Sequence, residues 1–309
     1  MPGRLRRITT SAVMAVIVIV YAVVLIDPGL LAHASPVSQG TNVLAGPGAG
    51  HLFGTDQLGR DVYSRVIYGA RPVLFGSLGG VLLATLAGVA IGVAGGIAPR
   101  WISAIIMRVV DVLLALPVLL VALILIATIG SGVNSIILAL GVAYTPGFAR
   151  VVEASVRKLR SVEYVQAARL FGSNGLRTSW QHLLPNLVTE VVVMASSAIG
   201  WAVLTATTLS FLGLGVQLPN ADWGSDLAAG AASLATAWWL STFPGIAITV
   251  TIFVANFAGD WVMGLIDQGN GRTFTRFRAF RGLQTTTPAA EPAAAPAGAA
   301  LIPATHEEA

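Results

Sequence analysis

The chain has 309 residues, of which 55% are hydrophobic and only 10% are charged, and its mean hydropathy is +0.78. A soluble domain usually carries about 25% charged residues, so this chain has too few charges to cover the surface of a soluble domain of its size. The apolar residues also come in long unbroken runs. Composition therefore excludes a cytosolic enzyme, a nucleic-acid-binding protein and a disordered protein, and it indicates an integral membrane protein.

The counts of cysteine, histidine and charged residues exclude further kinds of functional site. The absence of cysteine excludes disulfides, thiolate metal sites and cysteine nucleophiles. The four histidines are scattered without the spacing of a metal site, so we expect no bound metal. The formal charge of +4 comes from seventeen arginines and one lysine against the acidic residues. In a membrane protein we interpret this excess as a topology signal, not as a surface for nucleic acid.

Charge-free stretches place the membrane spans. A helix needs about 20 apolar residues to cross a hydrocarbon core of about 30 Å. The run from Val112 to Ala149 is long enough for most of two helices around the turn Gly130–Asn134. The sequence therefore predicts an all-α integral membrane protein with six transmembrane helices, at 8–31, 72–98, 102–129, 134–150, 187–212 and 242–265.

The basic residues orient these helices. If the six helices alternate, 15 of the 18 basic residues fall on one side, beginning with segment 1–7. Only Arg60, Arg65 and Arg71 fall on the other side. The positive-inside rule therefore predicts that both termini are cytoplasmic, that residues 32–71 are external and that 72–265 form a five-helix core. The cytoplasmic tail 266–309 is rich in Pro and Ala, and we expect disorder from about residue 284.

The N-terminal segment has an alternative interpretation. Its arginines, its apolar core and the sequence Ala32-His33-Ala34 also fit a signal peptide with a cleavage site. The apolar stretch is longer than the usual ~7–15 residues of a signal peptide, which favours a membrane-spanning helix. Residue 40 is external under both interpretations.

The second predicted helix carries a face without large side chains. Small residues recur every four positions, at Gly76, Gly80, Ala84, Gly88, Gly92 and Gly96. Small residues let helix backbones approach closely in lipid, where hydrophobicity alone cannot drive helices together. We therefore interpret this face as a helix-packing surface, with direct contact to a transported solute as the alternative.

Missing motifs exclude several activities. A P-loop needs a Gly-Lys-[Ser/Thr] sequence, but the only lysine, Lys158, lies between Arg157 and Leu159. There is no G-x-S-x-G nucleophile elbow either. The chain therefore has no ATPase site of its own, and we predict no catalytic residue.

Three acidic residues lie in or near the predicted spans. A charge at mid-membrane costs about 2.5–3.5 kcal/mol on insertion scales, so each should have a partner or face water. For Asp111 we expect Arg108 to be the partner, because it precedes Asp111 by three residues on one helix. Glu190 and Asp260 lie near predicted helix ends, where interfacial solvation suffices. The alternative is a proton relay, which would indicate a secondary transporter.

The connection 151–186 between the fourth and fifth helices is longer than a helix hairpin needs. Segment 151–171 has helical periodicity. Gly172 breaks that helix, and a second short helix runs through Leu184 until Pro185 ends it. A helix–glycine–helix elbow suits docking to another protein, and a solvated connector is the alternative.

The residues of this elbow resemble the EAA loop of bacterial ABC importer permeases, the coupling helix that sits in a groove of the ATP-binding subunit. Ala167-Ala168, Gly172 and Leu184-Pro185 carry the resemblance, while Gln166 stands where the family has Glu. The peptide-transport branch has a longer pattern, which this chain matches at Tyr164, Val165, Ala167, Ala168, Arg169, Gly172, His182, Leu184, Pro185 and Asn186.

Other segments resemble the C-type permease of dipeptide, oligopeptide and nickel importers. They are 54–71, 107–117, 209–215, Trp223-Gly224-Ser225, Phe243-Pro244-Gly245 and the run from Asn256 to Asp260. The chain departs from the family pattern after Asp260. The resemblance implies a type I importer permease fold in the bacterial inner membrane, and a chain that lines half of a solute pathway. Peptides are the first expectation for the solute, and nickel or another small solute is the alternative.

The same resemblance implies partners. These are a homologous B-type permease, two ATP-binding domains that hold ATP and Mg, and an external solute-binding protein, with no cofactor in this chain. In the external segment, the spacing of Asp56, Arg60, Asp61 and Arg65 predicts local salt bridges and helix N-capping. The resemblance adds the alternative that these residues and Trp223 form an interface with the second permease and the binding protein.

Overall fold

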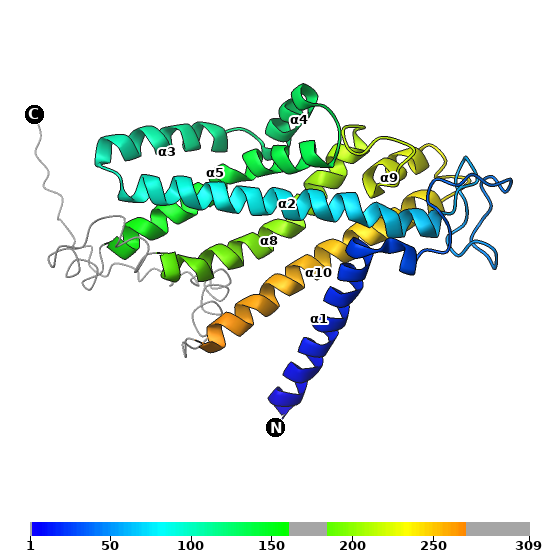
Figure 1. The fold of residues 1–309 in the computed structure, drawn as a ribbon, viewed down its shortest axis with the longest axis horizontal. Helices are drawn as coiled ribbons and strands as arrows, with labels where there is room; N and C mark the ends of the chain where they lie inside the picture. The colour runs from blue at the N-terminus through cyan, green and yellow to red at the C-terminus, as the bar shows by residue number, and fades with distance from the viewer. Residues whose placement is uncertain (1, 161–183, 270–309) are drawn as a thin grey trace, which may run out of the picture. The chain divides into compact units, whose positions relative to one another are not determined.

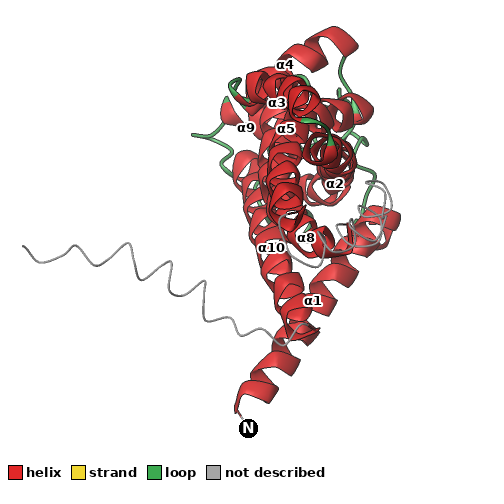
Figure 2. Cartoon of the chain, turned by 90° about the vertical axis from the view of Figure 1, so that its left-hand side faces the viewer, coloured by secondary structure: helices red, strands yellow, loops and turns green. Residues whose placement is uncertain are grey.

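The computed structural model describes residues 2–160 and 184–269, and the side chains of 14–158, 187–261 and 263. The chain divides into residues 1–266 and 267–309, and the features below belong to the first part. The described residues form helices and loops without a strand, as Figure 2 shows. The helices are α1 (Pro2–Ile26), η1 (Pro28–Leu30), α2 (Val62–Ile97), α3 (Arg100–Leu114), α4 (Val118–Ile129), α5 (Val133–Arg160), α8 (Leu184–Phe211), α9 (Trp223–Ala231) and α10 (Trp239–Gly269) (Figure 1).

Several of these helices are long and apolar enough to cross a membrane. They are α2, α5, α8 and α10, and the pair α3 and α4 passes the same test when taken together. The described apolar part of α1 is shorter, Met14–Ile26. Five of the six predicted spans therefore have a counterpart of sufficient length in the described residues, the first corresponds to the shorter α1, and the all-α membrane fold is confirmed.

The third predicted span, 102–129, is wrong as a single helix. It consists of α3 and α4, which are bent by 90° at the break between Leu114 and Val118. Pro117 explains the break, because its ring disfavours the helical conformation of Leu116 and its nitrogen has no hydrogen to donate. In Figure 1, α4 turns away from the direction of α3.

Among the helices that extend beyond their predicted spans, α2 and α5 do so by the most residues. α2 begins at Val62, not at residue 72, because Asp61 caps it by accepting a hydrogen bond from the backbone nitrogen of Ser64 at 2.8 Å. α5 continues past the predicted end at residue 150 to Arg160. Hydropathy marks only the apolar part of a helix, so it predicts a start of α2 and an end of α5 that both lie inside the actual helices.

The small-residue face of α2 packs against α5. An added Cβ at Gly76, Gly80, Gly88, Gly92 or Gly96 would come closer than 3.0 Å to α5 atoms, and Ala84 between them is fully buried. The opposing α5 residues are Ile136, Leu140, Phe148, Ala149, Val152 and Val156. The interpretation as a packing surface is confirmed, and the surface joins two helices of the same chain (Figure 1).

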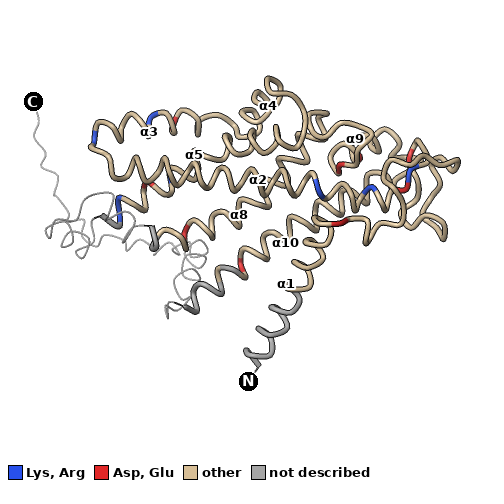
Figure 3. Tube along the Cα trace, viewed as in Figure 1, with Lys and Arg blue, Asp and Glu red and all other residues tan. Residues whose placement is uncertain are grey.

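Apolar clusters fill the space between the helices. The largest joins α2, α4, α5 and α8 around Ile136, Leu140 and Phe148. A smaller cluster of Val152, Val156 and Leu187 lies where α5 ends and α8 begins. Charged residues lie mostly toward the two ends of the bundle, as the coloured positions along the chain in Figure 3 show. The polar chemistry of the chain is therefore found at these ends.

Candidate functional site: the loop end and the cap

We use two names for the ends of the bundle. The loop end is where α5 ends at Arg160 and α8 begins at Leu184. The cap, at the opposite end, comprises residues 32–61 and 212–238, including α9 (Figure 1).

Most of the predicted coupling residues lie between the two described segments. Tyr164, Gln166, Ala167, Ala168, Arg169, Gly172 and His182 lie outside the described residues. Leu184 and Pro185 form the first turn of α8. Proline is favoured in the first turn of a helix, because its missing N–H would have no helical partner there. Leu184 and Pro185 therefore begin the next membrane helix, and the prediction that they end a preceding short helix is wrong.

A buried acid organises the charges of the loop end. Glu153 of α5 is only 4% exposed, and its carboxylate pairs with Arg157, one turn later, and with Arg150 at 3.7 Å. Glu153 was not predicted, because the charge-free run ends the fourth predicted helix at residue 150. The i, i+3 and i, i+4 spacing of Arg150, Glu153 and Arg157 is the signal that would have identified it.

The two arginines connect α5 to α3. Arg150 reaches Asp111 of α3 at 3.5 Å, and Arg157 donates a hydrogen bond to the hydroxyl of Ser103 at 2.9 Å. The predicted pairing of Asp111 with Arg108 is therefore wrong. The partner comes from the neighbouring helix, and Arg108 is exposed on α3. The ends of α3 and α5 are held together by these contacts.

The remaining predicted polar residues of the spans lie on α8 and α10. Glu190 accepts a hydrogen bond from the Ser155 hydroxyl at 2.6 Å, which links α8 to α5. Asn256 donates to the carbonyl of Ile252 at 3.0 Å and lies beside Gly200 of α8. Asp260 is exposed on α10. Within the described segments, no hydrogen bond or ion pair joins Asp111, Glu190 and Asp260 to one another, and no group of three acids or histidines could hold a metal ion.

In the cap, the predicted local roles are confirmed for Asp56, Arg60 and Asp61, but not for Arg65, whose ion pair is with distant Asp226. Asp56 pairs with Arg60 at 2.6 Å and accepts the backbone N–H groups of Leu58 and Arg60 at 2.8 and 2.9 Å. Asp61 caps α2, as described above, and also contacts His51 at 3.1 Å. Both acids therefore stabilise the fold of their own segment.

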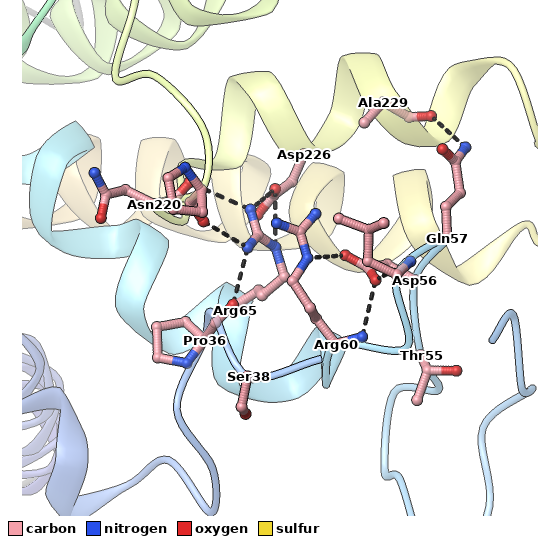
Figure 4. Close-up of polar contacts among 12 residues, drawn as sticks. Pro36, Ser38, Thr55, Asp56, Gln57, Arg60, Arg65, Asn220, Asp226 and Ala229 are labelled. Carbon is pink, nitrogen blue, oxygen red and sulfur yellow. Dashed lines mark hydrogen bonds and ion pairs between the residues drawn. The ribbon is translucent and has the colours of Figure 1, made fainter. Parts of the chain in front are cut away.

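Arg65 has a long-range role that local spacing did not predict. Its guanidinium pairs with Asp226 of α9 and donates to the carbonyls of Pro36 at 2.9 Å, Pro219 at 3.2 Å and Asn220 at 3.3 Å (Figure 4). One side chain thus joins α2, the segment before it, the loop after α8 and α9. Only an arginine offers several donors in a fixed plane for such a set of acceptors.

Most of the predicted interface residues of the cap are buried within the chain. Trp223 is 3% exposed and donates from Nε1 to the carbonyl of Val66 at 2.7 Å. Asp56, Arg60 and Arg65 are also buried. These side chains therefore hold the cap together from inside, and their contacts are with the chain itself.

Asp222 is a further buried acid of the cap. It caps α9 by accepting the backbone N–H groups of Gly224 at 2.9 Å and Ser225 at 3.2 Å, and it contacts the Ser210 hydroxyl. Burial away from water raises the pKa of Asp222 from 3.8 to about 6, against the opposing effect of these hydrogen bonds. Burial also raises the pKa of Asp226, and the charge of Arg65 opposes that rise.

Together, these features define a polytopic α-helical membrane protein with a long connection at one end of its bundle and an ordered cap at the other. The chain belongs to the family of inner membrane components of binding-protein-dependent transport systems, whose model matches residues 80–272. It is therefore a multi-pass permease subunit of the bacterial inner membrane.

Named relatives cover most of the chain. A Brucella suis protein that carries the name of a peptide transport system permease is 41% identical over 72% of this chain and 74% of its own length. The di/tripeptide transport system permease of Pseudomonas aeruginosa is 37% identical over 72% and 74%. The glutathione transport system permease of Pectobacterium atrosepticum is 36% identical over 72% and 74%.

Proposed function

We propose that this chain is one permease subunit of an ATP-driven importer that carries dipeptides or short oligopeptides. The observation that carries the proposal is the similarity to permeases named for peptides, di/tripeptides and glutathione, each over almost three quarters of both chains. These solutes share a peptide backbone with two charged ends. The chain lines one half of the pathway, and a homologous permease supplies the other.

ATP and Mg belong to partner chains in this proposal. The sequence has no P-loop, so two separate ATP-binding domains power the cycle. An external solute-binding protein delivers the peptide. If the six helices alternate across the membrane, fifteen of the eighteen basic residues belong to one side. By the positive-inside rule, we propose that this side, with the loop end and both termini, is cytoplasmic and that the cap is external.

The segment 161–185 is the proposed coupling element, and the contacts at the loop end support this role. α5 leads into the segment at Arg160, and α8 leaves it at Leu184. Just inside these points, Ser155–Glu190 joins α5 to α8, and Arg150–Asp111 joins α5 to α3. A displacement of the segment by an ATP-binding subunit would therefore move three helices together.

Reconstituted transport tests the function. Liposomes that contain this chain with its partner permease, ATP-binding subunits and binding protein should take up a labelled dipeptide when ATP is present inside. Nickel ions should not be taken up. ATP-dependent uptake of nickel but not of peptides, or peptide uptake by this chain alone, would contradict the proposal.

Two variants test the coupling segment in the same liposomes. Gly172→Leu and the double variant Ala167→Asp/Ala168→Asp should still insert and pair with the second permease, but should lose uptake. The matched control, Ala289→Asp/Ala290→Asp, places the same charges in the C-terminal tail and should retain uptake. A pull-down of the ATP-binding subunit separates lost docking from lost coupling. Normal uptake by both loop variants would show that the segment is a passive connector.

A further inference from the structure

One side of α2 combines two polar side chains with four exposed apolar ones. Spacings of three or four residues align six side chains along one side of the helix. From the cap toward the loop end they are Tyr68, Arg71, Phe75, Leu78, Leu82 and Leu86. We call these six residues the α2 stripe. The glycines that contact α5 occupy other positions around the helix.

The polar end of the α2 stripe lines an open hollow. The hollow has a volume of about 390 Å³ and is bordered by Tyr68, Arg71, Phe75, Val133 and Asn220. Within the described part of the chain, the guanidinium of Arg71, the hydroxyl of Tyr68 and the side-chain amide of Asn220 form no hydrogen bond or ion pair. Three groups that can donate hydrogen bonds therefore border one hollow, and none has an acceptor among the described residues.

The position of this hollow along the bundle is that of a membrane boundary. The charge-free run of α2 begins at Pro72, immediately after Arg71. α5 begins at Val133, which borders the same hollow. Arg71 therefore lies at the level where lipid headgroups meet the hydrocarbon core, on the cap side.

The apolar end of the α2 stripe faces outward. Phe75 is 49% exposed, Leu82 60% and Leu86 63%. At a rise of 1.5 Å per residue, Phe75 to Leu86 extends about 16 Å. Half of a hydrocarbon core of about 30 Å is one leaflet, about 15 Å. The apolar part of the α2 stripe thus matches the depth of one leaflet, directly below the cation.

We propose that the α2 stripe binds one anionic phospholipid of the cap-side leaflet. The phosphate accepts hydrogen bonds from Arg71, whose planar fork of donors fits a phosphate, with Tyr68 and Asn220 at the same headgroup. One acyl chain lies along Phe75, Leu78, Leu82 and Leu86. A free phosphate would use only the polar end, whereas a phospholipid uses the full length of the α2 stripe.

Native mass spectrometry of the full chain in detergent, alone and with its partner permease, tests this site. The probes are palmitoyl-oleoyl-phosphatidylglycerol, the phosphatidylcholine with the same acyl chains, and inorganic phosphate. The unsubstituted chain should retain phosphatidylglycerol in preference to phosphatidylcholine. Arg71→Gln should weaken phosphatidylglycerol binding about fivefold, which corresponds to about 1 kcal/mol for one basic residue at a membrane surface.

Two control variants separate a site from general charge. Arg71→Lys keeps the charge and should retain most of the binding. Arg108→Gln removes an exposed arginine of α3 and should leave the preference unchanged. Equal binding of both lipids, or no effect of Arg71→Gln, would overturn the proposal. Displacement by inorganic phosphate would show a free-anion site instead. Expulsion of the lipid when the partner permease binds would show that the α2 stripe is a protein interface, and this outcome also overturns it.

Discussion

Replacing Gly92 with alanine tests how closely α2 packs against α5. A Cβ at this position would lie 2.6 Å from the carbonyl oxygen of Ala149 and 2.7 Å from Cβ of Val152. Ordinary van der Waals contact begins at 3.4 Å, so the two helices would have to separate by about 1 Å locally. The carbonyl belongs to the α5 backbone and Val152 is 1% exposed, so neither can move aside alone.

The expected change in the free energy of unfolding is the difference between two opposing effects. Alanine is better than glycine in a helix by about 0.5–1 kcal/mol, while overpacking a tight interface costs about 1–3 kcal/mol. Gly92→Ala should therefore destabilise the chain by roughly 1–2 kcal/mol. Gly147→Ala is the matched control, because its nearest contact would be Cε of Met194 at 4.0 Å. It should be neutral or stabilising by up to about 1 kcal/mol.

Thermal unfolding in detergent measures this difference. At about 2–4 °C per kcal/mol for a chain of this size, Gly92→Ala should melt several degrees below Gly147→Ala. Both variants should be compared with the unsubstituted chain in the same detergent. A Gly92→Ala variant that melts as high as Gly147→Ala would show that α2 and α5 do not approach each other this closely.

Three further predictions concern buried charges. The folded pKa of Asp222, about 6, lies above its ordinary value of 3.8, so this group favours folding increasingly as pH falls from 7 toward 4. Asp222→Asn keeps an acceptor for the α9 cap and should remove about 3 kcal/mol of that pH dependence, measured as the change in melting temperature with pH for both proteins. Arg65→Met leaves Asp226 buried without its cation and should lower the stability by about 3–5 kcal/mol. The double variant with Asp226→Asn should recover part of the melting temperature. A melting temperature of Arg65→Met equal to that of the unsubstituted chain would show that this ion pair does not stabilise the cap. Glu153→Gln should lower stability by only about 1 kcal/mol, because its arginine partners are about half exposed and remain solvated; a melting temperature equal to that of the unsubstituted chain would show that the buried acid does not stabilise the loop end.

The sequence predicted the features that depend on local spacing. Helix capping was predicted for the group Asp56, Arg60, Asp61 and Arg65, and Asp61 is the member that caps α2, because a capping acid acts within one turn. Local salt bridges were predicted for the same group, and Asp56 and Arg60, four residues apart, form one. The glycine repeat of α2 was recognised as a packing surface, because a four-residue period forms a stripe along one side of a helix. In each case the partner or the pattern lies within a short stretch of sequence.

The sequence did not predict which distant elements meet. Arg65 and Asp226 are separated by 161 residues, and no pattern in one sequence pairs them. Asp111 was assigned to Arg108 by proximity along the helix, whereas the fold brings Arg150 to it from α5. The bend at Pro117 was not predicted for a different reason. Hydropathy counts apolar residues and does not register the missing N–H group that ends α3.

The relation between α2 and α5 shows how a local motif and a distant contact combine in function. α5 contains Pro146, which removes one helical hydrogen bond and by itself would allow the helix to bend there. α2 contacts α5 on both sides of this proline, through Gly76 and Gly80 toward the cap and through Gly92 toward the loop end. The proline of α2, Pro72, lies before this contact region, so α2 is uninterrupted along it. Because an uninterrupted helix supports α5 across its weak point, we expect a displacement at Arg160 to reach the cap end of α5 instead of being lost at Pro146.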